Sequence, residues 1–445
     1  MQPRSNNTYG ASRLFDCLYL VAAIVLIPYF VWRRLYKKKK SAGWRKKLGY
    51  VPERPADTPR VWIHAVSVGE TTAAETLFKA LKQRVPATDI VVSTTTTTGQ
   101  SVAIKRYGAE NVFFYPLDLS SVVKRTLDRV SPTVLVLMES EVWPNMTAEA
   151  TRRNIPIVVV NGRITERAAR RYRRFWFLVG PSFHRIGRWL MQSEEYAARL
   201  RALGVDDRHI RISGNMKYDA MDDLIIGQPA RAAMRAALGI AANALVLACG
   251  STHPSEESAL LTAYARLRAS SVPSLRLILV PRHPERTSDV AAQILAAGMR
   301  PLLRSAMSQN IADDAKSPPS QIEQPPVLLV DTLGELKHMY SVSDVAFVGG
   351  SLIPWGGQNI MEPCGLGVPT LHGPHMHNFN DAMEILRASS GSVQVTFETL
   401  FPELERLLLD RESAVAMGTR AREAFMRARG ATSTVAEYIC ELLHA

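Results

Sequence analysis

The chain has 445 residues, 47% of them hydrophobic and 21% charged, which suits two or three globular domains, and it carries a formal net charge of +13. The charge is concentrated in two segments, since residues 1–47 hold eleven Lys and Arg with one Asp, and residues 152–188 hold ten Arg with one Glu. The remainder is slightly acidic, so the pattern fits a surface that meets something anionic and argues against a long nucleic-acid track. The four cysteines are far apart, which indicates neither a disulfide framework nor a Cys-based metal site and fits a reducing compartment.

The first predicted element is an apolar segment at residues 14–32, interrupted by Asp16 and Pro28. At about 1.5 Å per residue it is just long enough to cross the hydrocarbon core of a bilayer. A basic cluster follows directly, and by the positive-inside rule it places the rest of the chain in the cytoplasm. We predict a membrane anchor with its basic flank over residues 1–50, either as a single span or as an interfacial helix. A cleaved signal peptide fits less well, because the charge comes after the apolar run and no A-x-A site follows.

Beyond a proline-rich linker, strand-like and helix-like patterns alternate. Apolar strand patterns occur at residues 61–66, 89–95, 112–116, 133–139, 155–161, 188–193 and 209–213, and then at 244–250, 275–281, 326–332, 344–350 and 368–373. This alternation predicts an α/β protein with parallel sheets covered on both faces. We predict two Rossmann-like, doubly wound domains over residues 58–228 and 240–430, with a ligand-binding cleft between them and a final helix at 431–445.

Three motifs in the first predicted domain carry groups suited to catalysis. In H-A-V-S-V-G-E, Glu70 opens a helix just after a strand, where a carboxylate either caps the helix or takes a proton from an attacking hydroxyl. In L-M-E-S-E-V-W-P-N, Glu139 and Glu141 follow another strand. In S-G-N-M-K-Y-D, Lys217 follows the last strand, where it is either a solvated surface group or a partner for a phosphate.

The second predicted domain offers groups that bind phosphate and ribose. Arg282 and His283 follow a strand in V-P-R-H-P-E-R, and a guanidinium suits phosphate. The glycine-rich segment 349–357 permits close backbone approach to a phosphate, with amides at a helix start to hold it. Glu362, on the next helix, suits the ribose hydroxyls. No Asp pair at i, i+2 is present and His372, His375 and His377 lack metal-ligand spacing, so we predict no metal cofactor.

Many motifs in order, from residue 64 to about 380, resemble the 3-deoxy-D-manno-octulosonic acid (Kdo) transferase family. They are H-A-V-S-V-G-E, T-x-T-x-T-G near residues 94–99, E-S-E-V-W-P-N, V-N-G-R, G-N-M-K-Y-D, S-T-H-P-S-E-E, V-P-R-H-P-E-R, D-T-L-G-E-L and G-G-S-L…G-G-Q-N-I-M-E-P. The resemblance implies a GT-B fold and an inverting glycosyltransferase of lipopolysaccharide biosynthesis at the bacterial inner membrane. It also implies CMP-Kdo as donor and a phosphorylated lipid A precursor, lipid IVA, as acceptor.

The same resemblance implies roles for single residues. Glu70 matches the general base, and Glu139 and Lys217 match stabilisers of the transition state. The CMP contacts match Arg282, His283, Leu333, Gly334, Glu335, Asn359, Ile360, Met361 and Glu362. Gln358 stands where the family usually has His, and it cannot be protonated.

Two alternatives remain open. One is a different membrane glycosyltransferase that uses a UDP-sugar, and the other is a tethered protein that only docks on anionic lipid or nucleic acid; the acidic remainder of the chain argues against nucleic acid. The arginine run at residues 163–174 either holds the phosphates of a lipid acceptor at an anionic membrane surface or is a solvated helix face.

Overall fold

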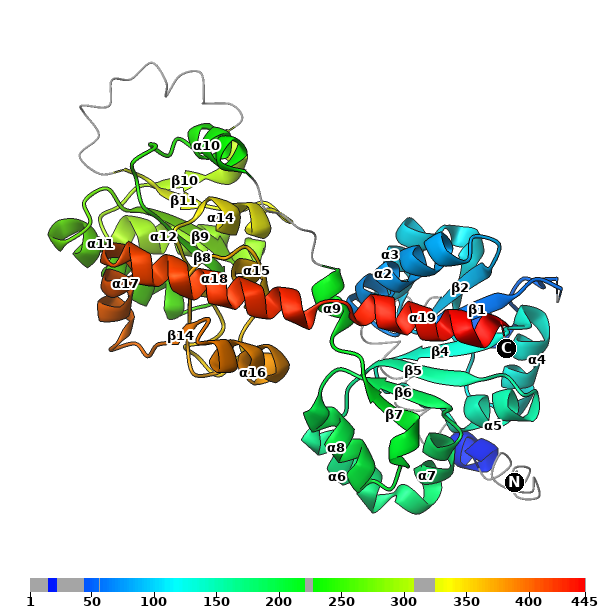
Figure 1. Ribbon diagram of the computed structural model, residues 1–445. Helices are drawn as coiled ribbons and strands as arrows, with labels where there is room; N and C mark the ends of the chain where they lie inside the picture. The colour runs from blue at the N-terminus through cyan, green and yellow to red at the C-terminus, as the bar shows by residue number, and fades with distance from the viewer. Residues whose placement is uncertain (1–14, 22–43, 56, 221–226, 308–324, 445) are drawn as a thin grey trace. The chain divides into compact units, whose positions relative to one another are not determined.

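The computed structural model describes residues 15–21, 44–55, 57–220, 227–307 and 325–444 (Figure 1). The chain forms two compact units: unit 1 comprises Met1–Ala220 and Arg429–Ala445, and unit 2 comprises Met221–Ala428. The final helix, predicted as a segment of its own, is α19 (Ala431–His444) and packs against α2 (Val68–Arg84) in unit 1.

Unit 1 is built on a parallel sheet of seven strands in the order β3-β2-β1-β4-β5-β6-β7. The strands are β1 (Arg60–His64), β2 (Asp89–Thr94), β3 (Val112–Phe114), β4 (Val134–Met138), β5 (Ile157–Gly162), β6 (Arg188–Met191) and β7 (Ile210–Ile212). All seven predicted strands of this unit are therefore confirmed.

The helices of unit 1 connect these parallel strands. Besides α2 and α19 they are α3 (Thr97–Tyr107), α4 (Ser120–Val130), α5 (Pro144–Arg152), α6 (Glu166–Arg174), α7 (Trp176–His184), α8 (Glu194–Ala202) and α9 (Met216–Asp219), with short 3₁₀ turns at Trp44–Lys47, Ala109–Asn111 and Asp207–His209. Several start at a Ser or Thr whose side chain accepts a hydrogen bond from the first turn, as Ser67 does for α2, Thr96 for α3 and Ser193 for α8.

Unit 2 repeats the design with the strand order β10-β11-β9-β8-β12-β13-β14, again all parallel. Its strands are β8 (Val246–Thr252), β9 (Arg276–Pro281), β10 (Pro301–Leu303), β11 (Val327–Leu329), β12 (Val345–Val348), β13 (Thr370–His372) and β14 (Val393–Gln394). The sequence patterns missed β10 and β14, because edge strands of three and two residues are too short to show a period.

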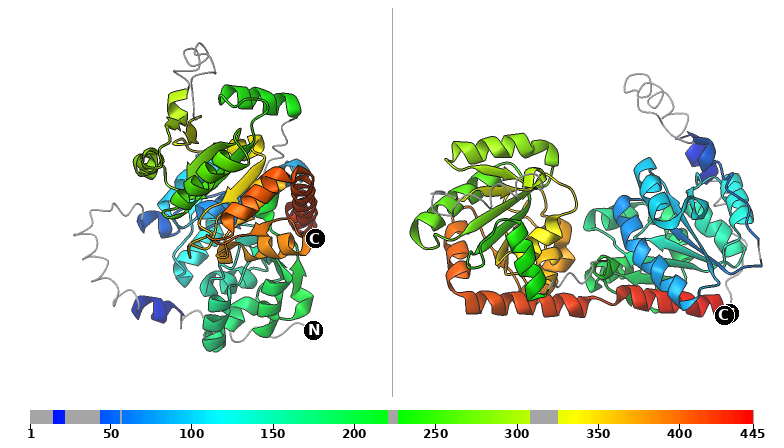
Figure 2. Two further views of the ribbon diagram at one scale, coloured as in Figure 1. Left: turned by 90° about the vertical axis from the view of Figure 1, so that its left-hand side faces the viewer. Right: turned by 90° about the horizontal axis from the view of Figure 1, so that it is seen from above.

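The helices of unit 2 are α10 (Gln228–Ala237), α11 (Glu256–Ser270), α12 (Thr287–Ala296), α14 (Leu336–Val342), α15 (Met361–Gly365), α16 (Asn380–Ser389), α17 (Leu400–Leu409) and α18 (Arg411–Ala428), with 3₁₀ turns at Pro284–Arg286, Arg304–Ala306 and His377–Phe379. Figure 2 shows helices on both sides of each sheet.

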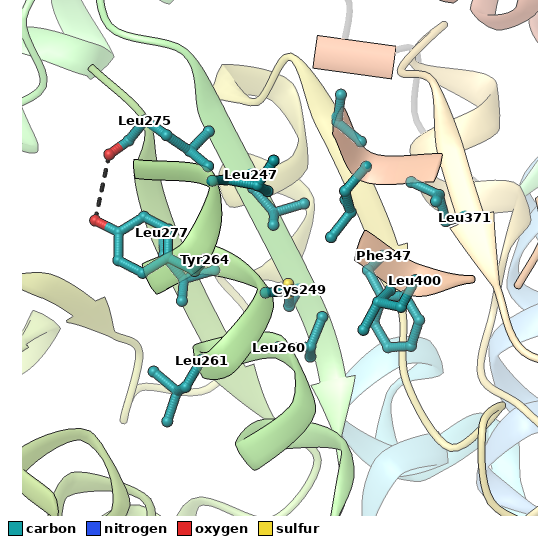
Figure 3. Packing of buried hydrophobic residues seen from close by; sticks show 14 of the residues in the cluster. Leu247, Cys249, Leu260, Leu261, Tyr264, Leu275, Leu277, Phe347, Leu371 and Leu400 are labelled. Carbon is teal, nitrogen blue, oxygen red and sulfur yellow. Dashed lines mark hydrogen bonds between the residues drawn. The ribbon is translucent and has the colours of Figure 1, made fainter. Parts of the chain in front are cut away.

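Successive residues of a strand point to opposite faces of the sheet and pack into two different hydrophobic cores. This explains why the strands are continuously apolar in sequence. In β8, Leu247 and Cys249 join one cluster while Val246 and Ala248 join another. Figure 3 shows the first cluster, in which the Tyr264 hydroxyl donates to the Leu275 carbonyl at 3.2 Å. Unit 1 likewise has one core on each face of its sheet. Because helices cover both faces of each sheet, we expect ligands to bind at the edge formed by the carboxyl ends of the strands.

The predicted membrane anchor lies mostly outside the described residues. Within them, residues 15–21 are helical, and no described helix is long and apolar enough to cross a membrane. Asp16, which interrupts the apolar run in the sequence, is hydrogen-bonded to protein groups: its Oδ1 accepts from the amide of Ser120 at 2.9 Å and from Nδ2 of Asn145 at 3.0 Å.

Candidate active site

Glu70 lies at the start of α2, six residues beyond the end of β1. Its Oε2 accepts from the Val66 amide at 2.8 Å and its Oε1 from the Ser67 hydroxyl at 2.7 Å, while Ser67 caps the helix in return. These bonds between Glu70 and the N-cap residue Ser67 stabilise the start of α2, so the capping role foreseen for Glu70 is present. It does not exclude chemistry, because a carboxylate oxygen has lone pairs for a further hydrogen bond.

The surroundings of Glu70 change its acidity. Burial raises the pKa of its carboxyl to about 7, and the charges of Glu139 and Glu141 add to that effect, while hydrogen bonds from Val66 and Ser67 oppose it. A carboxylate with a pKa near 7 is well matched to proton transfer at neutral pH. Three acidic side chains from the ends of β1 and β4 are thus neighbours.

Glu139 and Lys217 form an ion pair, with Nζ of Lys217 donating to Oε1 of Glu139 at 3.0 Å. Glu139 follows β4 in the left-handed region, with φ of +57°, a conformation that is uncommon for residues other than glycine and that often marks a functional site. Burial and the charge of Glu139 raise the pKa of the nearby Glu141. The structure therefore brings Glu70, Glu139 and Lys217 together within unit 1.

Two asparagines that the sequence did not single out hold Lys217 in place. Oδ1 of Asn161 accepts from the Met216 amide at 3.0 Å, and Oδ1 of Asn215 accepts from the Lys217 amide at 3.0 Å. Asn161 is the penultimate residue of β5 and has a positive φ of +54°. Asp219, two residues after Lys217, accepts from the amides of Gly430 and Thr432 at 2.7 and 2.6 Å, which ties α9 to the start of α19. In the sequence, the only sign of these two asparagines was that each comes at or shortly after the end of an apolar strand pattern.

His64, the first residue of the Glu70 motif, is structural. Its ring stacks on Tyr115 with centroids 3.7 Å apart, and its Nδ1 lies 3.0 Å from the Ser93 hydroxyl. Burial lowers its pKa to about 3, so the ring stays neutral at physiological pH.

In unit 2, the expectation that the Gly349–Gly350–Ser351 amides hold a phosphate is wrong. The buried carboxylate of Glu256 already accepts from the amides of Gly350, Ser351 and Leu352 at 2.7, 3.0 and 3.0 Å. Gly349 is needed for a close approach to protein, because a Cβ there would lie 2.4 Å from the Ser251 carbonyl oxygen. The sequence did not reveal this, because Glu256 lies almost one hundred residues away.

Arg282 and His283 do follow a strand and are exposed, directly after β9. The turn is fixed by a bidentate ion pair in which Arg286 donates to the buried carboxylate of Glu257 at 2.9 and 3.2 Å. His253, which directly follows the neighbouring strand β8, meets His283 edge-on with ring centroids 5.9 Å apart. Arg282 and His283 are therefore exposed basic side chains at the carboxyl edge of unit 2.

His253 was overlooked as a site residue. Its ring stacks on Trp355 with centroids 5.0 Å apart, and Nε2 of Gln358 lies 3.5 Å from its Nε2. Burial lowers the pKa of His253, and the charge of His283 adds to this. A neutral His253 can accept from the Gln358 amide, so the glutamine that departs from the family pattern has a partner in the structure.

The remaining predicted donor contacts lie at the ends of β11 and β12. Leu333 is 84% exposed and Gly334 has φ of +86°, while Glu335 pairs with Arg304 at 2.9 Å. Nδ2 of Asn359 donates to Oε1 of Glu362 at 3.0 Å. Ile360 and Met361 are fully buried, so they can offer a ligand only their backbone.

The predicted site residues thus form two sets, a catalytic set in unit 1 and a set of candidate donor contacts in unit 2. Each set follows the carboxyl ends of strands of one parallel sheet, where such sheets bind ligands. The structure describes no group of three or more His, Cys, Asp or Glu side chains placed to hold a metal ion in the ranges it covers.

The sequences of known proteins decide the family. Residues 42–220 match the family described as 3-deoxy-D-manno-octulosonic-acid transferase (kdotransferase). A relative with that function in its name, from Haemophilus influenzae, is 34% identical over 403 residues, which is 88% of this chain and 90% of the relative. The chain belongs to the Kdo transferase family. A second Kdo transferase, from Bordetella pertussis, is 31% identical over 93% of this chain and 96% of its own length. The chain is therefore a glycosyltransferase.

Solved structures support the fold of this Kdo transferase family member. A glycosyltransferase from Rickettsia africae matches 87% of the chain and 99% of its own with a TM-score of 0.57 and 12% identity. A UDP-GlcNAc 2-epimerase from Neisseria meningitidis matches 86% and 99%, also with a TM-score of 0.57, at 13% identity. At such low identity they show the fold alone: two parallel α/β sheets of the GT-B-like kind.

Proposed function

We propose that the chain transfers Kdo from CMP-Kdo to a phosphorylated lipid A precursor, lipid IVA, with inversion and without a metal ion, in lipopolysaccharide biosynthesis. The observation that carries the proposal is the buried Glu70 beside the Glu139–Lys217 ion pair, in a member of the Kdo transferase family. A carboxylate with a pKa near 7 beside a fixed ammonium suits a reaction in which a hydroxyl loses a proton while a phosphate leaves.

The proposed step is a single displacement. The acceptor hydroxyl attacks the anomeric carbon of Kdo as its proton passes to the Glu70 carboxylate. The bond between that carbon and the CMP phosphate oxygen breaks, and the electron pair leaves with CMP. Lys217 balances the negative charge of the departing phosphate. One displacement inverts the anomeric centre.

The donor and the absence of a metal requirement have a common test. A donor with one phosphate has one charged group to neutralise, and Arg282 and His283 can do this without a metal ion. We expect CMP in EDTA to raise the thermal unfolding temperature and UDP to raise it much less, since a ligand stabilises the state that it binds. Turnover in EDTA should equal turnover in magnesium. A larger shift with UDP, or activity that only magnesium restores, would overturn this part of the proposal.

The surface proposed to meet the lipid acceptor is the arginine face of α6. Arg167, Arg170, Arg171, Arg173 and Arg174 are all exposed, and the adjoining Phe177 is 81% exposed. The basic patch is narrower than its sequence suggests, because Arg153 pairs with Glu149 and with Asp128. Guanidinium groups beside an exposed aromatic ring suit an anionic lipid surface.

Neutralising Arg170, Arg171, Arg173 and Arg174 to Gln tests this surface. Each basic group near an anionic surface contributes about 1 kcal/mol, so we expect the KM for lipid acceptor to rise by about tenfold or more while the KM for CMP-Kdo stays unchanged. The control neutralises the same number of exposed basic residues on other helices and their flanks: Lys79, Lys105, Lys124 and Arg208. Equal KM values for the lipid acceptor in both variants would show that α6 is only a solvated helix face and does not meet the acceptor.

We also propose that the apolar segment at residues 14–32 holds the protein at the bacterial inner membrane by lying in the interface, with the two units on the cytoplasmic side, because a spanning segment would carry Asp16 away from Ser120 and Asn145. The support is the basic cluster that follows the apolar run, which by the positive-inside rule stays in the cytoplasm. Protease added to sealed inverted membrane vesicles should digest the two units, and protease added to intact spheroplasts should leave them whole.

A further inference from the structure

Two helices of unit 1 start without a cap of their own. α4 begins after Leu119 and α5 after Trp143, and neither residue makes a side-chain capping bond. The first amides of a helix lack partners within the helix and need acceptors from elsewhere. Here both sets of amides meet carboxylates from other segments of the chain.

The acceptor for α4 is Asp16, from the N-terminal helix of residues 15–21. Its Oδ1 accepts from the Ser120 amide at 2.9 Å, and its Oδ2 contacts the Ser120 hydroxyl. Oδ1 also accepts from Nδ2 of Asn145 at 3.0 Å, so the same carboxylate links α4 to the first turn of α5. In Figure 1 the dark blue helix of residues 15–21 lies beside α5.

The acceptor for α5 is Asp118, which the N-terminal helix also contacts. Asp118 is buried and accepts from the amides of Asn145 and Met146 at 3.0 and 2.8 Å. Tyr19, on the same helical segment as Asp16, donates its hydroxyl to Asp118 at 3.1 Å. The N-terminal helix therefore reaches the start of α5 twice, through Asp16 directly and through Tyr19 by way of Asp118.

The start of α5 is next to the acidic motif. Glu139 and Glu141 lie in the five-residue connection between β4 and α5, and Trp143 at its end packs near Tyr115 with ring centroids 6.1 Å apart. A short connection is held at both ends, so the position of α5 helps to set the position of Glu139. An interaction made by a residue more than one hundred positions away in sequence can thus affect a catalytic group.

We infer that Asp16 is a positioning residue: the N-terminal helix of residues 15–21 fixes the start of α5 and thereby the Glu139–Trp143 connection. The inference rests on the proposed function, which assigns Glu139 a role in the reaction. It also explains a carboxylate within an apolar run, because that carboxylate binds the protein. Residues 15–21, within the segment proposed to hold the enzyme at the membrane, are in this way part of unit 1.

The test compares three single substitutions in the full-length chain. Asp16→Ala removes the shared acceptor. Asp16→Asn keeps one oxygen that can accept from Ser120 and Asn145, and is the conservative rescue. Cys17→Ala, at an exposed neighbour on the same helical segment, is the matched control. The readouts are kcat, the KM for CMP-Kdo, and hydrogen exchange of the peptide that spans residues 139–146.

We expect Asp16→Ala to lower kcat by about tenfold or more, with an unchanged donor KM and faster exchange in residues 139–146. Asp16→Asn should recover most of the loss, and Cys17→Ala should match the wild type. If Asp16→Ala does not fold, Tyr19→Phe, which removes only the hydroxyl bound to Asp118, should show the same pattern more weakly.

Wild-type rates and exchange in both Asp16→Ala and Tyr19→Phe would overturn the inference, as would a loss of kcat with no change in local exchange. A wild-type enzyme that does not transfer Kdo is a different result, since it counts against the proposed function. In that case the exchange measurement still decides whether Asp16 fixes the connection.

Discussion

Replacing Glu70 with Gln should lower kcat by about 10²- to 10⁴-fold, the usual range for loss of a general base. The amide keeps an oxygen that can accept from Val66 or Ser67, so the start of α2 should remain folded. CMP binding should also be retained, because the candidate donor contacts lie in unit 2. Steady-state kinetics and a CMP thermal shift on the same sample separate these effects.

The pH profile gives Glu70 a second signature. Burial raises its pKa to about 7, so the carboxylate is mostly protonated below pH 7 and ionised above it. Because a general base must be ionised, the kcat of the wild type should rise as the pH increases through about 7. In Glu70→Gln this rise should disappear. A variant that keeps more than about a tenth of the wild-type rate, or an unchanged profile, contradicts the role.

Replacing Lys217 with Met should lower kcat by about 10²- to 10³-fold, the range seen when one group that stabilises developing charge is removed. Two losses combine here. The departing phosphate loses a cation, and Glu139 loses its partner at 3.0 Å. An unpaired Glu139 raises the pKa of Glu70 further, since its charge already acts in that direction. In the pH profile of the activity that Lys217→Met retains, the rise in rate should therefore occur at a higher pH than in the wild type.

The control for Lys217 is Lys79→Met, which removes an ion-paired ammonium from the exposed side of α2. It should change kcat by less than twofold, because exposed pairs contribute little. If Lys217→Met behaved like Lys79→Met, the ion pair with Glu139 would be only a structural contact, and the phosphate would have to be balanced by other groups.

Much of the fold followed from local patterns. Parallel strands buried on both faces are written as continuous apolar runs, so the central strands such as β4 and β8 were clear from the sequence. The edge strands β10 and β14 were not, because they are two or three residues long. The Glu70–Glu139–Lys217 group was also within reach, because each residue follows a strand of the same sheet.

The partners of those groups could not be predicted, because they come from distant parts of the chain. Glu256 binds the amides of the glycine-rich loop that were expected to meet a phosphate. Asp16 caps α4 from a segment that reads as a membrane anchor. A local pattern shows which residue types are present, but not which buried donors they satisfy.

The most direct test of the central claim is the mass of the product. The full-length enzyme, in mixed micelles with EDTA, is incubated with CMP-Kdo and lipid IVA, and the lipid is analysed by mass spectrometry. The account predicts a lipid heavier by a whole number of Kdo residues, with release of one CMP for each, and about a hundredfold less of it or lower still with Glu70→Gln in the same time. Unmodified lipid IVA in the presence of active, folded enzyme, or a lipid modified only when a UDP-sugar is supplied, would contradict it.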